Sequence, residues 1–167
     1  MARRATPLAA IRLLVLDVDG VLTDGRLIYG PDGEREKVFH VRDGYGIRML
    51  AASGVMIALI SGRSSEAVAR RCADLGILEV QQGIKEKGAA FSVLIARLGF
   101  AAHECACIGD DTLDVTMMRQ VGLAVAVADA HSDARRIAHR RTRLRGGAGA
   151  VREVCDWLLA ARKRAGR

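Results

Sequence analysis

Residues 12–20 read RLLVLDVDG, an apolar run that ends in the two carboxylates Asp17 and Asp19. A continuous apolar run that ends in acid is typical of a central strand in a parallel sheet, which is buried on both faces. The pattern recurs in three later segments: residues 55–60, 105–108 and 123–127. We expect all of these segments to be inner strands of one parallel sheet.

Helices are expected between the strands, because the intervening segments have helical spacing and several stop at a glycine. They cover residues 44–52, 64–75, 85–98, 112–121 and 151–162. Strands that alternate with helices predict an α/β fold, a Rossmann-like parallel sheet with helices on both faces. Such sheets carry their functional residues at the carboxyl ends of the strands.

One segment interrupts the alternation. Residues 26–41 read RLIYGPDGEREKVFHV, two extended runs on either side of Gly-Pro-Asp-Gly, which predicts a β-hairpin. Because this hairpin follows the strand that ends at Asp17, we expect it to form a flap beside the site. The sequence contains no internal repeat or linker, so we expect one domain over residues 1–167.

Composition argues against several classes of protein. Half of the 167 residues are hydrophobic, which argues against disorder, and no apolar run approaches the ~20 residues that span a membrane. The four cysteines lack the paired Cys-x-x-Cys motifs of a zinc site. No small-residue cleavage site follows the first apolar run, as a signal peptide would require. We therefore expect a cytoplasmic protein that does not associate with membranes.

The formal net charge of +7 comes largely from basic residues in the last third of the chain. A nucleic-acid binder would carry such a patch. Single-strand binders also need stacking aromatic residues, and this region has one aromatic residue, Trp157, within an apolar helical pattern. A solvated face or an anionic small substrate explains the charge better, and nucleic-acid binding stays an alternative.

Acidic residues follow two of the predicted strands: Asp17 and Asp19 after the first, and Asp110 and Asp111 after the third, with Asp114 one helical turn later. One carboxylate that leaves a buried strand can act as a nucleophile while a second moves protons. Carboxylates gathered in one pocket repel each other unless a cation neutralises them, and hard oxygen ligands point to Mg²⁺. Asp110 or Asp111 can also cap the next helix.

Groups suited to phosphate follow the second predicted strand. Ser61, Gly62 and Arg63 offer a hydroxyl, free backbone N–H groups and a guanidinium at the start of a helix, where phosphate binds well. Lys87, near the start of the next helix, can balance the charge of a phosphoryl group. As an alternative, the tripeptide is a helix cap.

The acidic pair, the hydroxyl, the lysine and the acidic cluster, in this order, resemble the four motifs of the haloacid dehalogenase superfamily of phosphatases over nearly the whole chain. The resemblance implies that Asp17 attacks phosphorus and forms an aspartyl-phosphate. It implies that Asp19 protonates the leaving alcohol and then activates water, while Ser61 and Lys87 hold the phosphoryl oxygens. The implied ligands of Mg²⁺ are Asp17, the Asp19 carbonyl oxygen and Asp110, with Asp111 in support.

Members of this superfamily often carry a separate cap domain, and this chain has no room for one. The span from Asp19 to Ser61 holds only the hairpin and one helix, and the span from Lys87 to Asp110 holds little more than one helix. An open site needs another cover. We therefore expect a neighbouring subunit to supply it, and hence a homo-oligomer.

Longer strings are similar to one capless family, the 3-deoxy-D-manno-octulosonate 8-phosphate phosphatases of lipopolysaccharide biosynthesis. They are DVDGVLTDG at 17–25, VRDGYGIR at 41–48, VGLAVAVADA at 121–130 and RGGAGAVRE at 145–153. The resemblance implies a homotetramer whose hairpins form a central barrel and whose tails, residues 143–167, reach toward a neighbour's site. The substrate contacts that it implies are Arg63, Gly62, Arg42, Lys37 and Arg145. Cationic side chains suit a sugar acid phosphate, which carries two anionic groups.

Two alternatives stay open. A related capless group hydrolyses a nine-carbon 2-keto-3-deoxy sugar acid 9-phosphate. That group is expected to carry glutamate in place of Arg63 and to lack the string at 41–48, so both features favour the eight-carbon substrate. A non-catalytic scaffold of the same fold is expected to have lost Asp17, Lys87 or Asp110, and this chain keeps all three.

Overall fold

A six-stranded parallel sheet forms the centre of the computed structural model, which describes residues 5–31 and 33–166. The order across the sheet is β5 (Glu79–Gln81), β4 (Met56–Ile60), β1 (Leu13–Leu16), β6 (Cys105–Gly109), β7 (Leu123–Ala126) and β8 (Arg140–Arg141). Every residue of β1, β6 and β7 is buried, because helices cover both faces of the sheet. The predicted fold class and all the predicted inner strands are confirmed.

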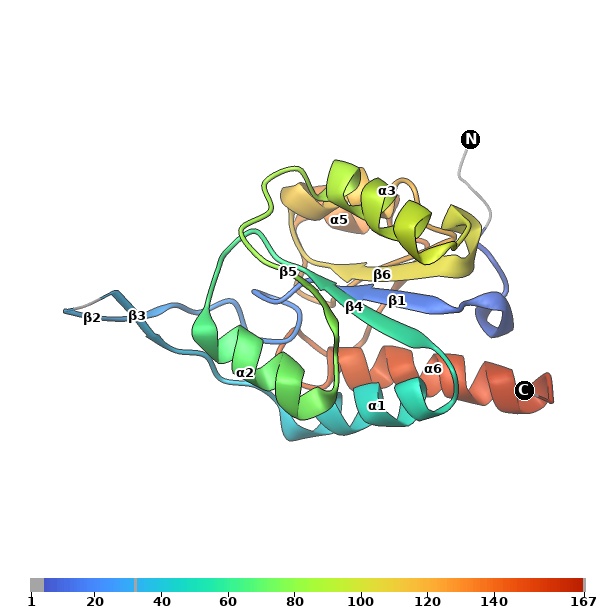
Figure 1. Cartoon of the computed structure of the whole chain (residues 1–167), viewed down its shortest axis with the longest axis horizontal. Helices are drawn as coiled ribbons and strands as arrows, with labels where there is room; N and C mark the ends of the chain where they lie inside the picture. The colour runs from blue at the N-terminus through green and yellow to red at the C-terminus, as the bar shows by residue number, and fades with distance from the viewer. Residues whose placement is uncertain (1–4, 32, 167) are drawn as a thin grey trace.

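The helices form two layers, which Figure 1 shows with α3 and α5 above the sheet and α1, α2 and α6 below it. The α-helices are α1 (Val41–Ala52), α2 (Glu66–Leu75), α3 (Lys87–Leu98), α4 (Val115–Met118), α5 (Ser132–Ile137) and α6 (Ala150–Arg164). Short 3-10 helices are η1 (Leu8–Ala10), η2 (Ala102–Glu104) and η3 (Thr112–Asp114). Together the layers bury both faces of the sheet.

Some helices begin or end at residues other than those predicted, because a side-chain cap or a tight turn determines the boundary. α1 begins three residues earlier than predicted, because Nδ1 of His40 accepts the N–H of Arg42 and caps the helix. The predicted helix at 112–121 starts as the 3-10 turn η3, so α4 is short. α2 and α3 end at Gly76 and Gly99 as predicted, each in the left-handed conformation with φ of 72°.

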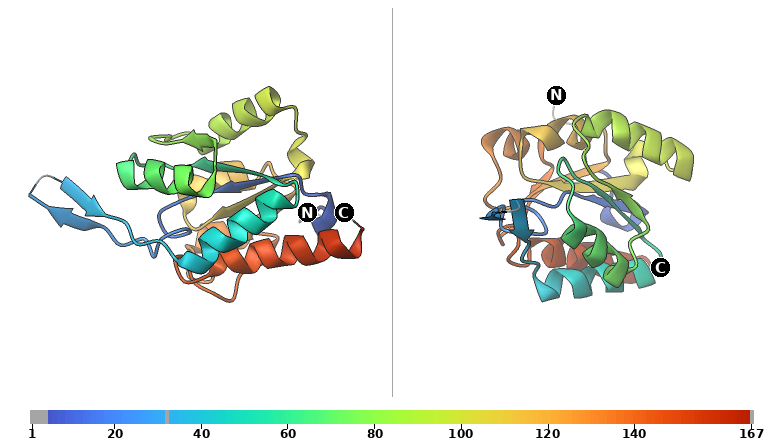
Figure 2. Two further views of the ribbon diagram at one scale, coloured as in Figure 1. Left: turned by 60° about the horizontal axis from the view of Figure 1, so that its bottom comes forward. Right: turned by 60° about the vertical axis from the view of Figure 1, so that its left-hand side comes forward.

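The predicted hairpin is present and projects as an arm from one end of the sheet (Figures 1 and 2). Its strands are β2 (Ile28–Gly30) and β3 (Gly33–Glu36), which pair antiparallel. The hairpin is shorter than residues 26–41, since Val41 already belongs to α1. Between β1 and β4, the described chain holds this arm and α1 and no further element, so no cap domain stands there.

All four cysteines are buried as free thiols. Burial raises the pKa of the Cys155 thiol to about 12 and that of Cys105 likewise to about 12. These side chains therefore serve as small hydrophobic groups. No helix within 5–31 and 33–166 is long and apolar enough to cross a bilayer.

Candidate active site

Most of the predicted catalytic and metal-binding residues converge at the carboxyl edge of the sheet. β1 lies between β4 and β6 in parallel register, with Leu16 opposite both Leu59 and Ile108, so the residues that follow the three strands come together. A pocket of about 190 Å³ opens there. It is lined by Asp17, Asp19, Gly62, Arg63, Lys87, Asp110, Asp111, Leu113 and Asp114.

Lys87 joins two buried carboxylates at the floor of this pocket. Its Nζ lies 2.7 Å from Oδ1 of Asp17 and 2.6 Å from Oδ1 of Asp114. Burial alone would lower the pKa of Lys87, but the two carboxylates outweigh burial and raise that pKa above its ordinary value. Lys87 is therefore a fixed cation beside the predicted nucleophile.

Negative charge nevertheless exceeds what one lysine neutralises. Burial, then the charge of Asp114, raises the pKa of Asp17 to about 7. Burial, then the charges of Asp17 and Asp114, raises the pKa of Asp110 to about 8. Each carboxylate is thus costly to ionise while no further cation is nearby.

The three carboxylates Asp17, Asp110 and Asp114 fit a metal ion. Each offers an oxygen atom, and these atoms all lie within 4.8 Å of one another. Oδ1 of Asp110 is buried and has no hydrogen-bond partner among the described residues. An oxygen of that kind is what a hard divalent cation would bind, so the donor set suits Mg²⁺.

Asp114 plays a larger part than sequence reasoning gave it. Besides holding Lys87, its Oδ2 accepts the N–H groups of Asp110 at 3.0 Å and Asp111 at 3.2 Å. It therefore shapes the loop that presents Asp110. The sequence placed Asp114 in the acidic cluster but gave no reason to assign it, because its burial depends on how α4 packs against β6.

Asp111 lies farther out than the three clustered carboxylates. Its Oδ1 accepts the N–H of Thr112 at 2.6 Å, so it caps η3, as the helix-cap alternative predicted. Asp111 still lines the pocket. Its supporting role toward Mg²⁺ stays a prediction.

Asp19 stands at the mouth of the pocket between two cations. Its carboxylate forms an ion pair with Lys37, and Nε of Arg63 lies 4.0 Å from its Oδ2. Arg63 also donates a hydrogen bond of 3.2 Å to the hydroxyl of Tyr29 on the hairpin. The arm thus contacts the site through Tyr29 and Lys37, beside the site as expected for a flap.

Ser61 and Gly62 occupy the turn after β4, as predicted. Ser61 is buried, and its Oγ accepts the N–H of Arg63 at 3.4 Å. Gly62 lines the pocket with its backbone. The turn carries the polar groups that phosphate would need, and their contact with a phosphoryl group stays a prediction.

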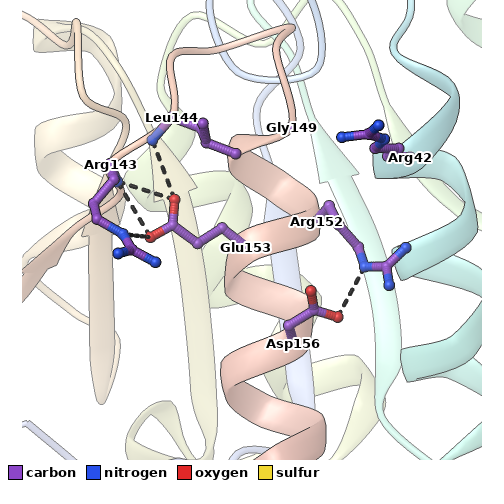
Figure 3. Close-up of a pocket in the computed structure, with 7 residues that line it drawn as sticks. All are labelled: Arg42, Arg143, Leu144, Gly149, Arg152, Glu153 and Asp156. Carbon is purple, nitrogen blue, oxygen red and sulfur yellow. Dashed lines mark hydrogen bonds and ion pairs between the residues drawn. The ribbon is translucent and has the colours of Figure 1, made fainter.

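Arg42 is not brought to this pocket within the single chain. It lines a separate cavity of about 560 Å³ between α1 and α6, shown in Figure 3. In that view Glu153 turns toward Arg143, whereas Asp156 turns toward Arg152. The predicted contact of Arg42 with substrate therefore has no support from the geometry of one chain.

The glycine-rich segment after Arg145 packs against residues 20–24 of the same chain, the loop after Asp19 that we call the catalytic loop. A Cβ at Gly146 would overlap the carbonyl oxygen of Gly20, and the N–H of Gly147 donates to the carbonyl of Val21 at 3.0 Å. The absence of side chains at Gly146 and Gly147 permits this close approach of the backbone. We expected the tail to reach toward a neighbouring subunit, but its glycine-rich stretch packs against its own chain. Arg145, just before that stretch, is exposed.

Comparison with known proteins extends over nearly the whole chain. The sequence profile of haloacid dehalogenase-like hydrolases matches residues 73–149. The 3-deoxy-D-manno-octulosonate 8-phosphate phosphatase of Escherichia coli strain K12 is 52% identical over 151 residues, which are 90% of this chain and 80% of that protein.

Solved structures agree with the sequence comparison. The 3-deoxy-D-manno-octulosonate 8-phosphate phosphatase from Moraxella catarrhalis, in complex with magnesium ion, phosphate ion and KDO, has a TM-score of 0.92 at 40% identity, covering 95% of this chain and 91% of that one. The Yersinia pestis phosphatase of the same name also gives 0.92, at 48% identity, covering 96% and 86% of the two chains.

Proposed function

The chain belongs to the 3-deoxy-D-manno-octulosonate 8-phosphate phosphatases, a family of haloacid dehalogenase-like hydrolases, and from this premise we propose how its own residues perform the reaction. The reaction is the Mg²⁺-dependent hydrolysis of 3-deoxy-D-manno-octulosonate 8-phosphate to 3-deoxy-D-manno-octulosonate and phosphate, in lipopolysaccharide biosynthesis. The observation that carries the assignment of residues is the buried Asp17, held by Lys87 in a pocket with Asp110.

In the first step, an oxygen of Asp17 attacks phosphorus and the bond from phosphorus to the C8 oxygen of the sugar breaks. Asp19 gives its proton to that leaving oxygen, so the sugar departs as an alcohol. The position of Asp19 two residues after Asp17, at the mouth of the same pocket, supports this division of roles. The product of the step is an aspartyl-phosphate on Asp17.

In the second step, water attacks the phosphorus of the aspartyl-phosphate. Asp19, now a carboxylate, takes the proton of that water, and the bond between phosphorus and the Asp17 oxygen breaks. Phosphate leaves and Asp17 is regenerated as a carboxylate. The same residue thus serves as acid and then as base.

Charge neutralisation is the other requirement of phosphoryl transfer. Asp17, Asp110 and the Asp19 carbonyl oxygen would hold Mg²⁺, with Asp111 in support, and the bound ion supplies positive charge to the transferring phosphoryl group. Lys87 adds a second positive charge from the floor of the pocket. Ser61 and the backbone of Gly62 would hold phosphoryl oxygens from the turn after β4, at the same edge of the sheet.

Arg63 is the side chain best placed to receive the sugar acid. Its guanidinium is partly exposed, lines the pocket and lies near Asp19. A guanidinium binds a carboxylate through two parallel hydrogen bonds, which suits the acid group of the substrate. Arg42 and Arg145 lie outside this pocket in one chain, so we infer that any contact they make with substrate requires a second subunit.

We further infer a homotetramer in which the hairpins meet. Exposed apolar side chains on and beside the arm support the inference: Leu27, Ile28, Tyr29 and Val38. A capless site that needs a cover gives the same expectation. A cytoplasmic location is part of this proposal, and the buried free thiols are consistent with a reducing compartment.

Substrate choice is tested by a direct comparison of phosphate release with Mg²⁺. The eight-carbon sugar acid 8-phosphate, the nine-carbon sugar acid 9-phosphate and a panel of neutral sugar phosphates should be compared by kcat/KM. We expect the eight-carbon acid to rank first. A higher kcat/KM for the nine-carbon acid would assign that compound as the substrate instead. If no ester released phosphate, a non-catalytic scaffold would be favoured.

A further inference from the structure

Asp43 is a buried carboxylate that the mechanism above does not use. It is the third residue of α1 and 1% exposed, whereas its neighbour Arg42 faces solvent. Its Oδ1 accepts the backbone N–H of Arg152 at 2.7 Å, across 109 positions of sequence. Burying a carboxylate costs folding free energy unless neighbouring groups stabilise it, so we looked for the groups that stabilise Asp43.

The N-terminus of α6 provides part of that stabilisation. The residue before the helix, Gly149, has no side chain and therefore no cap of its own, which leaves the first N–H groups of α6 without side-chain partners from its own turn. Asp43 supplies the missing acceptor from another helix. Its carboxylate thus lies at the N-terminal turns of α1 and α6 together, where both helix dipoles favour negative charge.

The two helices can approach this closely because of Gly46. A Cβ at Gly46 would stand 2.7 Å from Cδ of Arg152 and 3.3 Å from Cβ of Cys155. α1 and α6 pack against each other below the sheet (Figure 1). Asp43 and Gly46 both come from the string at 41–48, and together they fix where α6 begins.

The position of the N-terminus of α6 in turn affects the glycine segment that packs against the catalytic loop. Gly146 and Gly147 lie four and three residues before the helix starts at Ala150, and Gly146 donates its N–H to Oδ1 of Asp129 at 3.1 Å. Gly146 leaves no space for a Cβ against the carbonyl of Gly20. Gly20 leaves none against the carboxylate of Asp110.

Contacts, together with the short stretch of chain between Gly146 and α6, therefore connect Asp43 to Asp110. α6 is held by Asp43, the glycine segment is held by α6, the loop after Asp19 rests on the glycine segment, and Asp110 rests on that loop. We infer that a displacement of the start of α6 pulls on the segment that packs against Gly20. Because Gly20 lies against the carboxylate of Asp110 and directly follows Asp19, such a movement would shift Asp110 and the Asp19 carbonyl oxygen.

We propose that Asp43 is a positioning residue of the phosphatase: by anchoring the start of α6 it holds the catalytic loop, and so the metal-binding oxygens, in register. The proposal rests on the proposed function only for the identity of those oxygens. Asp43 does not line the pocket that holds Asp17, Asp19 and Asp110, so the role that we propose for it is indirect.

The test compares Asp43→Ala and Asp43→Asn with a matched control, Asp156→Asn. Asp156 also bonds Arg152, but through the side-chain Nε at 2.8 Å and on an exposed face, so the control keeps α6 anchored. Full-length proteins are titrated with Mn²⁺ alone and followed by electron paramagnetic resonance. Turnover is then measured against Mg²⁺ concentration, well below the unfolding temperature of every variant.

We expect Asp43→Ala to weaken Mn²⁺ binding several-fold, to raise the Mg²⁺ concentration for half-maximal activity in parallel, and to lower kcat by about tenfold to a hundredfold. KM at saturating Mg²⁺ should change little. Asp43→Asn retains an acceptor oxygen and should recover part of the loss, and Asp156→Asn should match the unchanged protein. If Asp43→Ala fails to fold, Asp43→Asn alone decides by the same criteria.

A lower unfolding temperature with unchanged Mn²⁺ affinity and unchanged kcat would overturn the proposal, since Asp43 would then act on stability alone. The metal titration does not depend on the substrate. Suppose that wild type does not hydrolyse the octulosonate phosphate but Asp43→Ala still weakens Mn²⁺ binding. That result would count against the proposed function and would leave the positioning role of Asp43 standing.

Discussion

Lys37 places its ammonium group on the carboxylate of Asp19, and 2% of the Lys37 side chain is exposed against 21% for Asp19. The lysine lies just after β3, so the base of the hairpin arm reaches the predicted acid and base of the reaction. The sequence led us to expect Lys37 as a contact of the sugar acid. Its enclosure favours a different role, the orientation of Asp19.

Replacing Lys37 by methionine separates these roles. If Lys37 orients Asp19, Lys37→Met should lower kcat by about tenfold to a hundredfold and leave KM nearly unchanged, because general acid–base catalysis depends on the placement of the proton donor. Steady-state kinetics with the octulosonate phosphate measure both constants. The exposed Lys85, as Lys85→Met, is the matched control. A rise in KM at constant kcat would assign Lys37 to the substrate instead.

Asp17→Asn should abolish turnover while the fold is retained. The amide cannot attack phosphorus, so we expect phosphate release to fall by about a thousandfold or more. Circular dichroism should show unchanged secondary structure, and Asp74→Asn on the exposed side of α2 should keep full activity. Normal turnover by Asp17→Asn would exclude the aspartyl-phosphate mechanism.

Asp110→Asn should act in opposite directions on stability and on metal response. Above about pH 8 the wild-type carboxyl is ionised, since burial and its acidic neighbours raise its pKa to about 8, and the ionised group destabilises the metal-free fold. We therefore expect the metal-free variant to unfold at a higher temperature than metal-free wild type at pH 8.5.

Mg²⁺ should reverse that order. At about a hundred times its Kd, a bound ion stabilises the folded state by ~2.7 kcal/mol, which corresponds to a rise of about 5–10 °C in Tm for a chain of this size. Wild type should show the rise and Asp110→Asn should show little of it, as measured by differential scanning fluorimetry with and without chelator. If Mg²⁺ raised the Tm of both proteins equally, Asp110 would not be a ligand of the metal.

The raised pKa of Asp43 makes the free energy of unfolding depend on pH. Burial is the largest influence and raises the pKa of Asp43, although the N–H of Arg152 and the charge of His40 oppose it. An acid with a raised folded pKa binds protons more tightly in the folded state, so stability falls as pH rises from about 4, where the unfolded carboxyl titrates, through the folded value.

The comparison with Asp43→Asn isolates this contribution. Relative to the variant, wild type should lose stability between pH 4 and the folded pKa and should then run parallel to it at higher pH. Denaturant unfolding at half-unit pH intervals measures the difference. Curves that stay parallel over the whole range would show that Asp43 titrates alike in both states.

The hairpin should hold the subunits together. Ile28→Lys places a charge on an exposed apolar side chain of β2, which should disfavour an interface there while leaving the single-chain fold intact. Sedimentation velocity should report a tetramer for wild type and a smaller species for the variant. A wild-type monomer with full turnover would contradict both the assembly and the need for a neighbour.

Local patterns explain what could be predicted from the sequence. The apolar run at 12–17 and the acid that ends it are adjacent in the chain, so both the strand and the place of Asp17 follow from neighbouring residues. β5 and β8, reading EVQ and RR, carry no apolar run, and they form because the edges of an existing sheet offer them partners. Hence the inner sheet was predictable and its edges were not.

The same distinction applies to the site. Asp17, Lys87 and Asp110 each begin or end an element, so a parallel sheet brings them together wherever its helices pack. The bond from Asp43 to Arg152 depends instead on how α6 returns beneath α1, and the pair of Lys37 and Asp19 depends on the course of the arm. No local pattern encodes either contact.

The support that Gly146 gives to Gly20 also has a consequence for protein synthesis. The carboxylates and the lysine lie between residues 17 and 114, whereas Gly146 and α6 come later in the chain and are translated after them. A nascent chain can therefore assemble the chemical groups of the site while its catalytic loop still lacks support from behind. We expect turnover to begin only after residues 146–164 have emerged from the ribosome and α6 has docked, so that premature termination yields chains with the right residues and little activity.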